Sequence, residues 1–130
     1  ADKEIINDLE TIKYSTNPYN INRLTQIAGL NALIENDYYM DNCKRIINNR
    51  EYTVAELTAL GFSILPSSAN FIFAKSDAID GKTLYEKLKE KGVLVRHFEK
   101  SRIKDYNRIT IGSKEEMKEF VSKVKEILGE

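Results

Sequence analysis

Two arginines on predicted strands are the residues of this chain best suited to binding a charged ligand. Arg108 lies in the segment NRITIG at 107–112, and Arg96 ends the segment GVLVR at 92–96. A guanidinium presents a planar fork of donors that matches a carboxylate or a phosphate. Alternation along the strand predicts that Arg108 and Thr110 share one face of a sheet, while the isoleucines beside them point into a core. A single arginine on a strand is more often a solvated or ion-paired surface residue, so the pair indicates an anion site only together with the rest of the sequence.

Asn70 and two tyrosines are weaker candidates for the same site. Asn70 opens a predicted strand at 70–75, and we expect alternation to place it on the face that carries Arg108. There it can support Arg108 or line a pocket, or it can simply bond to backbone where the strand begins. Tyr14 and Tyr19 lie in a turn, where a contact with substrate competes with simple turn packing.

His97 and Cys43 are the residues that most invite a catalytic interpretation. His97 follows Arg96 and points to the opposite face of the strand, which favours a packed or edge histidine over a catalytic one. Cys43 falls on the apolar stripe of a predicted helix, and no histidine is placed nearby in sequence to activate its thiol. We therefore expect Cys43 to be a core residue and assign no catalytic residue.

The charge balance argues against partners that are recognised by net charge. The 130 residues hold 20 basic and 20 acidic side chains, whereas nucleic-acid binding usually leaves a clearly basic footprint. No apolar run is long enough to span a membrane, and the first residues do not resemble a signal peptide. The single cysteine cannot form an internal disulfide, which fits a reducing cytoplasm. The sequence has no Cys/His cluster with metal-ligand spacing and no glycine-rich phosphate loop.

The first half of the chain has the apolar spacing of helices. This spacing predicts helices at 2–12, 21–34 and 37–60, and Gly61 ends the third at its C′ position. The second helix is apolar over much of its surface, so we expect it to be well buried. The third is longer than a small sheet needs and is expected to act as a strut between two bodies.

The second half changes to the two-residue period of strands, interrupted by two helices. A capping box, Ser113 with Glu116, marks the start of the last helix. The predicted order is a hairpin of strands at 62–66 and 70–75, a helix from Asp80 to Gly92, strands at 93–97 and 108–111, and the final helix.

This order predicts an α+β fold. We expect a small, mainly antiparallel sheet of β-β-α-β-β-α order, covered on one face by helices and preceded by two helices and a long connecting helix. Three parts are expected: 1–35 with the first two helices, 36–61 with the long helix, and 62–130 with the sheet.

Four segments resemble, in order and spacing, the C-terminal part of fold-type I aminotransferases, which depend on pyridoxal phosphate. Within that family the similarity is greatest to the histidinol-phosphate aminotransferases. It implies that 62–130 is the family's small domain and that 1–35 comes from the junction with the large domain. The segments are YSTNPYNINRLTQ at 14–26, REY at 50–52, SSANFIFA at 67–74, and the two arginine-bearing strands.

The resemblance implies roles for four residues on the substrate side. Arg108 would hold the α-carboxylate of the amino-acid substrate and help to grip the phosphate of histidinol phosphate in the other half-reaction. Arg96 would be a second phosphate contact. Asn70 and Tyr19 would contribute weakly. Bidentate bonds to the anion would orient the substrate amine toward the cofactor.

The resemblance also implies that the chemical half of the site is absent from this sequence. In the family, a lysine in a Ser-x-x-Lys stretch followed by Ala-Gly-x-Arg-x-Gly forms a Schiff base with pyridoxal phosphate, and no lysine here has that full context. We therefore expect a fragment of an enzyme more than twice as long, inactive and without cofactor when alone. Its parent would transfer an amino group between histidinol phosphate and glutamate in histidine synthesis, as a cytoplasmic homodimer.

Two other functions stay open on the sequence alone. A related enzyme for another phosphorylated amino compound, such as threonine-phosphate decarboxylase, would share these segments. A regulatory module whose arginines sense a small anion would need neither the strut nor the leading helices. A fragment that has lost its large domain should also expose an apolar patch around the first two helices and self-associate or be partly disordered there.

Overall fold

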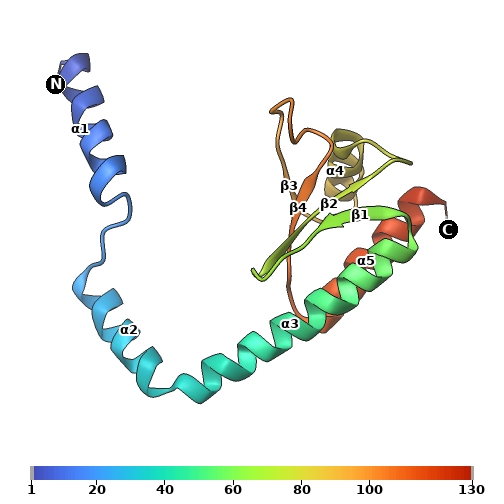
Figure 1. The fold of residues 1–130 in the computed structure, drawn as a ribbon, viewed down its shortest axis with the longest axis horizontal. Coiled ribbons are helices and arrows are strands. Elements are labelled where there is room, and N and C mark those ends of the chain that lie inside the picture. The colour runs from blue at the N-terminus through green and yellow to red at the C-terminus, as the bar shows by residue number, and fades with distance from the viewer. Residues whose placement is uncertain (1, 130) are drawn as a thin grey trace. The chain divides into compact units, whose positions relative to one another are not determined.

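The structure is a computed structural model that describes residues 2–129 (Figure 1). The chain divides into two compact units, one reaching to Tyr39 and the other starting at Met40, so the boundary falls inside a helix. The elements are α1 (Lys3–Thr16), α2 (Arg23–Ile34), α3 (Asn36–Ala59), β1 (Phe62–Leu65), β2 (Phe71–Ser76), α4 (Gly81–Glu90), β3 (Arg96–His97), β4 (Asn107–Thr110) and α5 (Lys114–Leu128).

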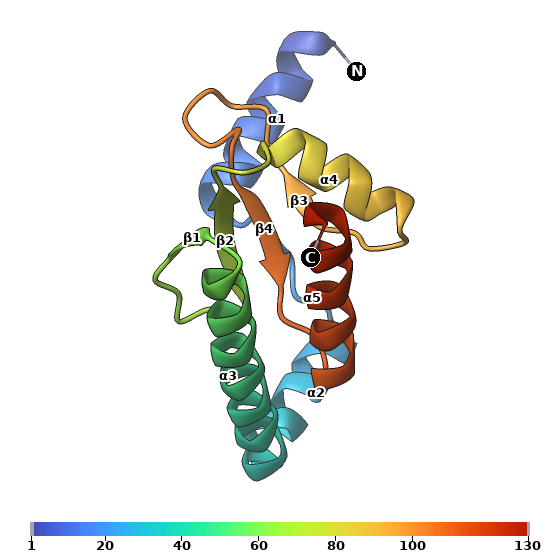
Figure 2. The ribbon, with the colours of Figure 1, turned by 90° about the vertical axis from the view of Figure 1, so that its right-hand side faces the viewer.

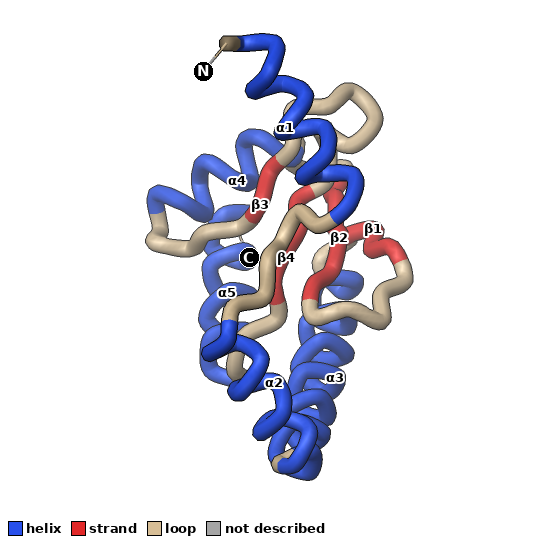
Figure 3. Tube along the Cα trace, turned by 90° about the vertical axis from the view of Figure 1, so that its left-hand side faces the viewer, coloured by secondary structure: helices blue, strands red, loops and turns tan. Residues whose placement is uncertain are grey.

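The second unit is built on a four-stranded sheet with the order β1-β2-β4-β3 (Figure 3). Every neighbouring pair of strands is antiparallel, and β1 and β2 form the predicted hairpin, with Phe62 opposite Ser76 and Leu65 opposite Phe73. The α+β class and the β-β-α-β-β-α order expected from the sequence are confirmed.

Helices α3, α4 and α5 lie on the same face of this sheet (Figure 2). One side of α5 is buried against the strands, because its apolar side chains recur every three or four residues. Burial of this apolar surface is the main stabilising contribution to the unit. The core contains Leu57, Leu60, Phe62, Ile72, Ala74, Leu84, Leu88, Ile109, Ile111, Met117, Phe120, Val121 and Val124.

Three helix ends follow the signals in the sequence, whereas α1 runs to Thr16, four residues beyond its predicted end and through the expected turn at Tyr14. The Ser113 hydroxyl accepts from the backbone N–H of Glu116 at 3.2 Å, and the backbone N–H of Ser113 donates to the Glu116 carboxylate at 2.7 Å. Asp80 caps α4 by accepting from the N–H of Thr83 at 3.0 Å. Gly61 has a φ of 79°, a left-handed conformation that glycine adopts without steric cost. The capping box, the α4 cap and the glycine stop are therefore confirmed.

The third strand is shorter than predicted. The expected strand at 93–97 contains only Arg96 and His97. Backbone N–H groups at the start of the predicted strand form hydrogen bonds with the end of α4 instead of with a neighbouring strand. The N–H of Val93 donates to the carbonyl of Leu88 at 2.9 Å, and the N–H of Gly92 donates to the carbonyl of Lys89 at 3.0 Å. Those bonds satisfy carbonyls left open at the helix terminus and keep Val93 out of the sheet.

The long helix packs over only part of its length. Its buried residues are Thr53 and Leu57, both in its second half, as expected for a helix longer than the sheet requires. Cys43 lies in the first half and is exposed, so its prediction as a core residue is wrong. An apolar stripe is buried only where a partner surface faces it.

Helix α2 differs most from expectation. None of its residues is buried, and Leu24 and Leu33 are 78 % and 76 % exposed. The prediction of a well-buried α2 is therefore wrong for the part of the chain that the structure describes. The predicted exposure of apolar side chains on the first two helices is confirmed.

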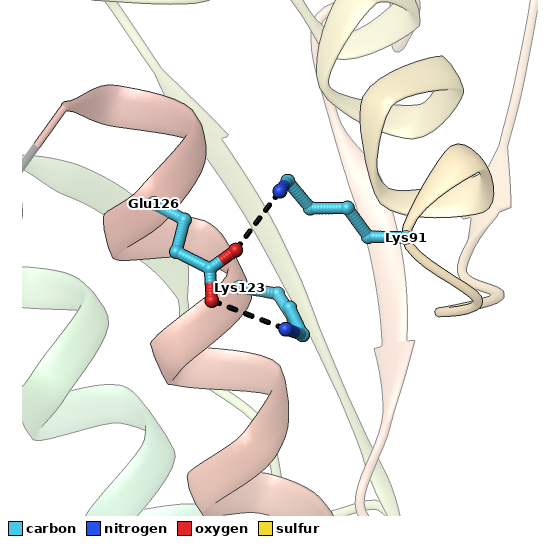
Figure 4. A network of polar contacts seen from close by, with 3 residues as sticks. All are labelled: Lys91, Lys123 and Glu126. Carbon is cyan, nitrogen blue, oxygen red and sulfur yellow. Dashed lines mark hydrogen bonds and ion pairs between the residues drawn. The ribbon is translucent and has the colours of Figure 1, made fainter.

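A three-residue ionic network joins the C-terminal ends of α4 and α5 (Figure 4). The ammonium groups of Lys91 and Lys123 lie 2.9 Å and 3.1 Å from the two carboxylate oxygens of Glu126. Hydrogen bonds from Lys91 and then Lys123 lower the pKa of the Glu126 carboxyl from its ordinary value of 4.5.

Between residues 2 and 129, no helix combines the length and the apolarity needed to cross a bilayer.

Candidate anion-binding site

The two arginines lie directly opposite each other on neighbouring strands. Arg96 of β3 pairs with Arg108 of β4, so both side chains project from the same face of the sheet. Both are exposed, whereas Ile109 is buried on the helix-covered face, and Thr110 shares the exposed side with Arg108. The predicted alternation along β4 and the shared face of the arginines are confirmed. Two like charges held side by side favour an anionic ligand.

Each guanidinium rests on an aromatic ring. The Cζ of Arg108 lies 5.3 Å from the ring centroid of Phe71, and the Cζ of Arg96 lies 5.5 Å from that of Phe98. Within residues 2–129, no carboxylate forms an ion pair with either arginine. A ring contact engages the flat face of a guanidinium and leaves its in-plane N–H donors available. The pair is therefore supported in place without being neutralised.

The rings form a connected layer on the arginine face. The ring of Phe73 stacks on Tyr106 with centroids 4.7 Å apart and meets Phe98 edge-on at 6.0 Å. Phe73 stands opposite Arg108 in the β2–β4 register. Lys75 also lies on this face, with its ammonium 5.9 Å from the centroid of Tyr106. The face thus combines cations with apolar rings.

A cavity of about 480 Å³ opens beside Arg108 on this face. Its walls are the rings of Phe71, Phe73 and Phe98, together with Ile103, the end of β1 and residues 66–69 of the loop that joins β1 to β2. Arg50 of α3 anchors the loop, because its Nη1 donates a hydrogen bond to the carbonyl of Ala69 at 2.6 Å. Within the loop, the Ser67 hydroxyl accepts from the N–H of Ala69 at 3.1 Å and donates to the carbonyl of Phe71 at 2.6 Å. These bonds give the cavity wall a defined shape.

Asn70 does not share the face of the arginine pair. Asn70 is exposed and precedes β2, and its backbone carbonyl accepts from the N–H of Ile111 at 2.9 Å. The β2 residues on the arginine face are Phe71 and Phe73, so the expectation that alternation puts Asn70 there is wrong. Tyr19 is 86 % exposed and belongs to the first unit. Its substrate-side role stays a prediction.

Sequence reasoning missed the aromatic residues of this face. Phe71 and Phe73 are separated by two positions, a spacing that places two side chains on one side of a strand. That spacing was visible in the sequence, but only the register between β2 and β4 shows that the two rings lie on the same face of the sheet as Arg108. Phe98 and Tyr106 lie at the two ends of the loop between β3 and β4, where periodicity gives no information.

His97 is a packed residue, as predicted. It is half-buried on the helix-covered face, with its Nδ1 3.2 Å from the Asn107 Oδ1 and its ring stacked on Tyr85 at 5.9 Å between centroids. It therefore faces away from the guanidinium pair.

The lysine on the arginine face lacks the sequence context expected of a Schiff-base lysine. Lys75 stands on the arginine face, but its ammonium lies over Tyr106 and 3.9 Å from the Asp77 carboxylate, in a strand with no Ser-x-x-Lys context. Within residues 2–129, no three His, Cys, Asp or Glu side chains gather as metal ligands do. The donor set of this face suits binding of an anion.

Comparison of the sequence with known proteins indicates one family. The sequence matches the family described as aminotransferase class I and II over residues 2–124. It is 47 % identical over 128 residues to the histidinol-phosphate aminotransferase of Brachyspira hyodysenteriae, which covers 98 % of this chain and 36 % of that protein. It is 43 % identical over 126 residues to the enzyme of the same name from Clostridium botulinum, covering 97 % and 36 %.

A solved structure shows the same fold. The histidinol-phosphate aminotransferase from Clostridium acetobutylicum matches with a TM-score of 0.76 over 91 % of this chain and 36 % of that one, at 24 % identity. The chain thus spans 36 % of the length of the two curated relatives that it matches.

Proposed function

Because the chain belongs to the class I and II aminotransferase family, we propose that it is the small-domain part of a histidinol-phosphate aminotransferase. Two relatives above 40 % identity carry that name, and the matched region covers nearly the whole chain. The activity belongs to a longer polypeptide, a cytoplasmic homodimer in this proposal. There, histidinol phosphate and glutamate exchange an amino group.

The observation that carries the proposal is the cross-strand pair of Arg96 and Arg108 on a ring-lined, exposed face. Histidinol phosphate ends in a phosphate, and glutamate carries two carboxylates, so both substrates present anions that guanidinium forks bind well. In this proposal Arg108 binds the α-carboxylate of glutamate and shares the phosphate of histidinol phosphate with Arg96. The pair then fixes the position of the reacting amine by holding an anionic group of each substrate.

The chemistry itself needs groups that this chain does not supply. Pyridoxal phosphate, bound by the rest of the longer polypeptide, provides the electron sink for amino transfer. The contribution of this chain is to bind and orient the anionic substrate, so we expect the chain alone to hold no cofactor and to show no transamination.

The test is activity in the longer polypeptide that carries this chain. Replacing Arg108→Ala removes charged hydrogen bonds worth about 1.5–3 kcal/mol each, so we expect kcat/KM for histidinol phosphate to fall by about tenfold to a hundredfold or more. Arg45→Ala, an exposed arginine of α3, is the matched control and should leave kcat/KM unchanged. Unaltered turnover in the Arg108→Ala enzyme would show that the site is wrongly assigned.

A substrate panel separates the proposed activity from its relatives. The wild-type enzyme should turn over histidinol phosphate in preference to threonine phosphate. A preference for threonine phosphate with release of carbon dioxide would replace the proposal by a decarboxylase. Micromolar binding of phosphate by the 130-residue chain alone would instead favour an anion-sensing module.

A further inference from the structure

The residues next to the two arginines form a hydrogen-bonded pair on the opposite face of the sheet. His97 follows Arg96 and Asn107 precedes Arg108, and His97 stands opposite Asn107 in the register. Because side chains alternate, the arginines project to the open face while His97 and Asn107 project toward α4. His97 and Asn107 are each joined to one of the arginines by a single peptide unit, so a shift of their hydrogen bond also shifts the backbone that carries the arginines.

Asn107 connects three separate elements. It is 1 % exposed, and its Nδ2 donates to the carbonyl of Gly81, the first residue of α4, at 2.8 Å. Its Oδ1 lies 3.2 Å from the Nδ1 of His97. A carbonyl can only accept, so the amide nitrogen must face Gly81 and the amide oxygen must face His97. The Nδ1 of His97 therefore carries the proton and donates it to Asn107.

Helix α4 fixes the other side of this arrangement. The His97 ring stacks on Tyr85 of α4 at 5.9 Å. At Gly81, an added Cβ would lie 2.7 Å from the carbonyl oxygen of Lys104 and 2.8 Å from that of Asp105. The loop between β3 and β4 thus packs against the start of α4 at a distance that only glycine permits.

We infer that His97 and Asn107 are positioning residues that lock the arginine pair in register. Strand β3 has only two residues, so backbone pairing alone holds it weakly, and a slip of one residue would turn Arg96 to the opposite face. The bond from His97 to Asn107, and from Asn107 to α4, prevents that slip. The inference rests on the proposed function only in what the positioned arginines bind.

Two substitutions at His97 separate the hydrogen bond from the ring. His97→Phe keeps a ring on Tyr85 and loses the donor, whereas His97→Asn loses the ring and keeps an amide N–H close to the position of Nδ1. The 130-residue chain is titrated with inorganic phosphate and followed by NMR, and amide hydrogen exchange is measured in β3 and β4 with β1 and β2 as internal reference.

We expect His97→Phe to weaken phosphate binding about tenfold and to reduce amide protection in β3 and β4 by a similar factor. His97→Asn should stay close to wild type in both measurements. Unchanged protection and affinity in His97→Phe, or equal losses in both variants, would overturn the lock. If wild type binds no phosphate but His97→Phe alone loses β3 protection, the lock stands and the proposed anion site fails.

Discussion

At the scale of single residues, the candidate site depends on aromatic rings that hold its two guanidiniums in place. A cation over a ring at an exposed position contributes about 0.5–1 kcal/mol, less than the 1.5–3 kcal/mol or so of a charged hydrogen bond to an anion. Phe71 and Phe98 therefore orient Arg108 and Arg96 without competing with a ligand for their donors. An arginine already paired with a carboxylate would have to exchange partners before it could bind substrate.

Arg50 gives a prediction for the wall of the cavity. Arg50→Met keeps much of the side-chain volume but removes the bond to the Ala69 carbonyl, so we expect the unfolding free energy to fall by about 1–2 kcal/mol. Residues 66–69 of the loop between β1 and β2 should also lose amide protection. Urea denaturation and hydrogen exchange measure the two effects. Arg45→Met, on the exposed side of the same helix, serves as control, and equal stability of the two variants would contradict the anchoring role.

The face of the sheet to which a side chain points could be predicted only where a buried neighbour in the same strand fixed the alternation. Ile109 lies in the core, so the orientation of Arg108 followed directly from the sequence. Asn70 stands just outside β2, and the buried Ile72 shows that Phe71 and Phe73, one position out of step, are the residues on the arginine face. Alternation thus predicted the arginines correctly but could not choose the starting point of the next strand.

At the scale of elements, helix ends marked by a capping residue or a glycine were predictable, whereas the end of α1 and the start of β3 were not. The box of Ser113 and Glu116 is local, because both partners lie within one turn of helix. The start of β3 depends on how α4 ends, since Val93 bonds back to Leu88 instead of to a strand. That competition is between two structures and leaves no periodic signal in the sequence.

The junction of α4 and α5 gives a prediction for pH. The pKa of Glu126 is lowered in the folded chain, mainly by Lys91, so its stabilising contribution is complete above about pH 4.5 and is lost as pH falls through the lowered pKa. The melting temperature should therefore fall more steeply between about pH 6 and pH 3 in wild type than in Glu126→Gln. Thermal unfolding followed by circular dichroism tests this. Glu119→Gln, on the same helix, is expected to keep the wild-type slope, and equal slopes in Glu126→Gln and wild type would refute the role of the network.

At the scale of the whole molecule, the two units differ in how far the apolar side chains of their helices are buried. In the second unit the apolar side chains of α4, α5 and the second half of α3 are buried against the sheet. In the first unit they are exposed, because α1 and α2 contain no buried residue. Amphipathic or apolar spacing shows that a helix needs a partner, but it does not show whether that partner lies within the same chain.

The exposed first unit predicts self-association. Apolar side chains such as Leu24 and Leu30, 78 % and 62 % exposed, should cause the chain to associate as concentration rises. Sedimentation velocity should show the average mass increasing, and Leu24→Glu with Leu30→Glu should restore the monomer. Leu94→Glu, 77 % exposed in the second unit, is the matched control. A wild-type chain that stays monomeric at all concentrations would contradict the prediction.

The most direct test of the central claim is whether the arginine pair recognises the phosphate of the substrate. The 130-residue chain is titrated with histidinol phosphate and with histidinol, which lacks the phosphate, and followed by NMR. We expect only histidinol phosphate to shift the resonances of Arg96 and Arg108, with an affinity of about millimolar. A double Arg96→Gln and Arg108→Gln variant should lose the response, while Arg23→Gln with Arg45→Gln, of equal charge change, should keep it. Equal responses to both ligands, or undiminished binding by the first double variant, would contradict the account.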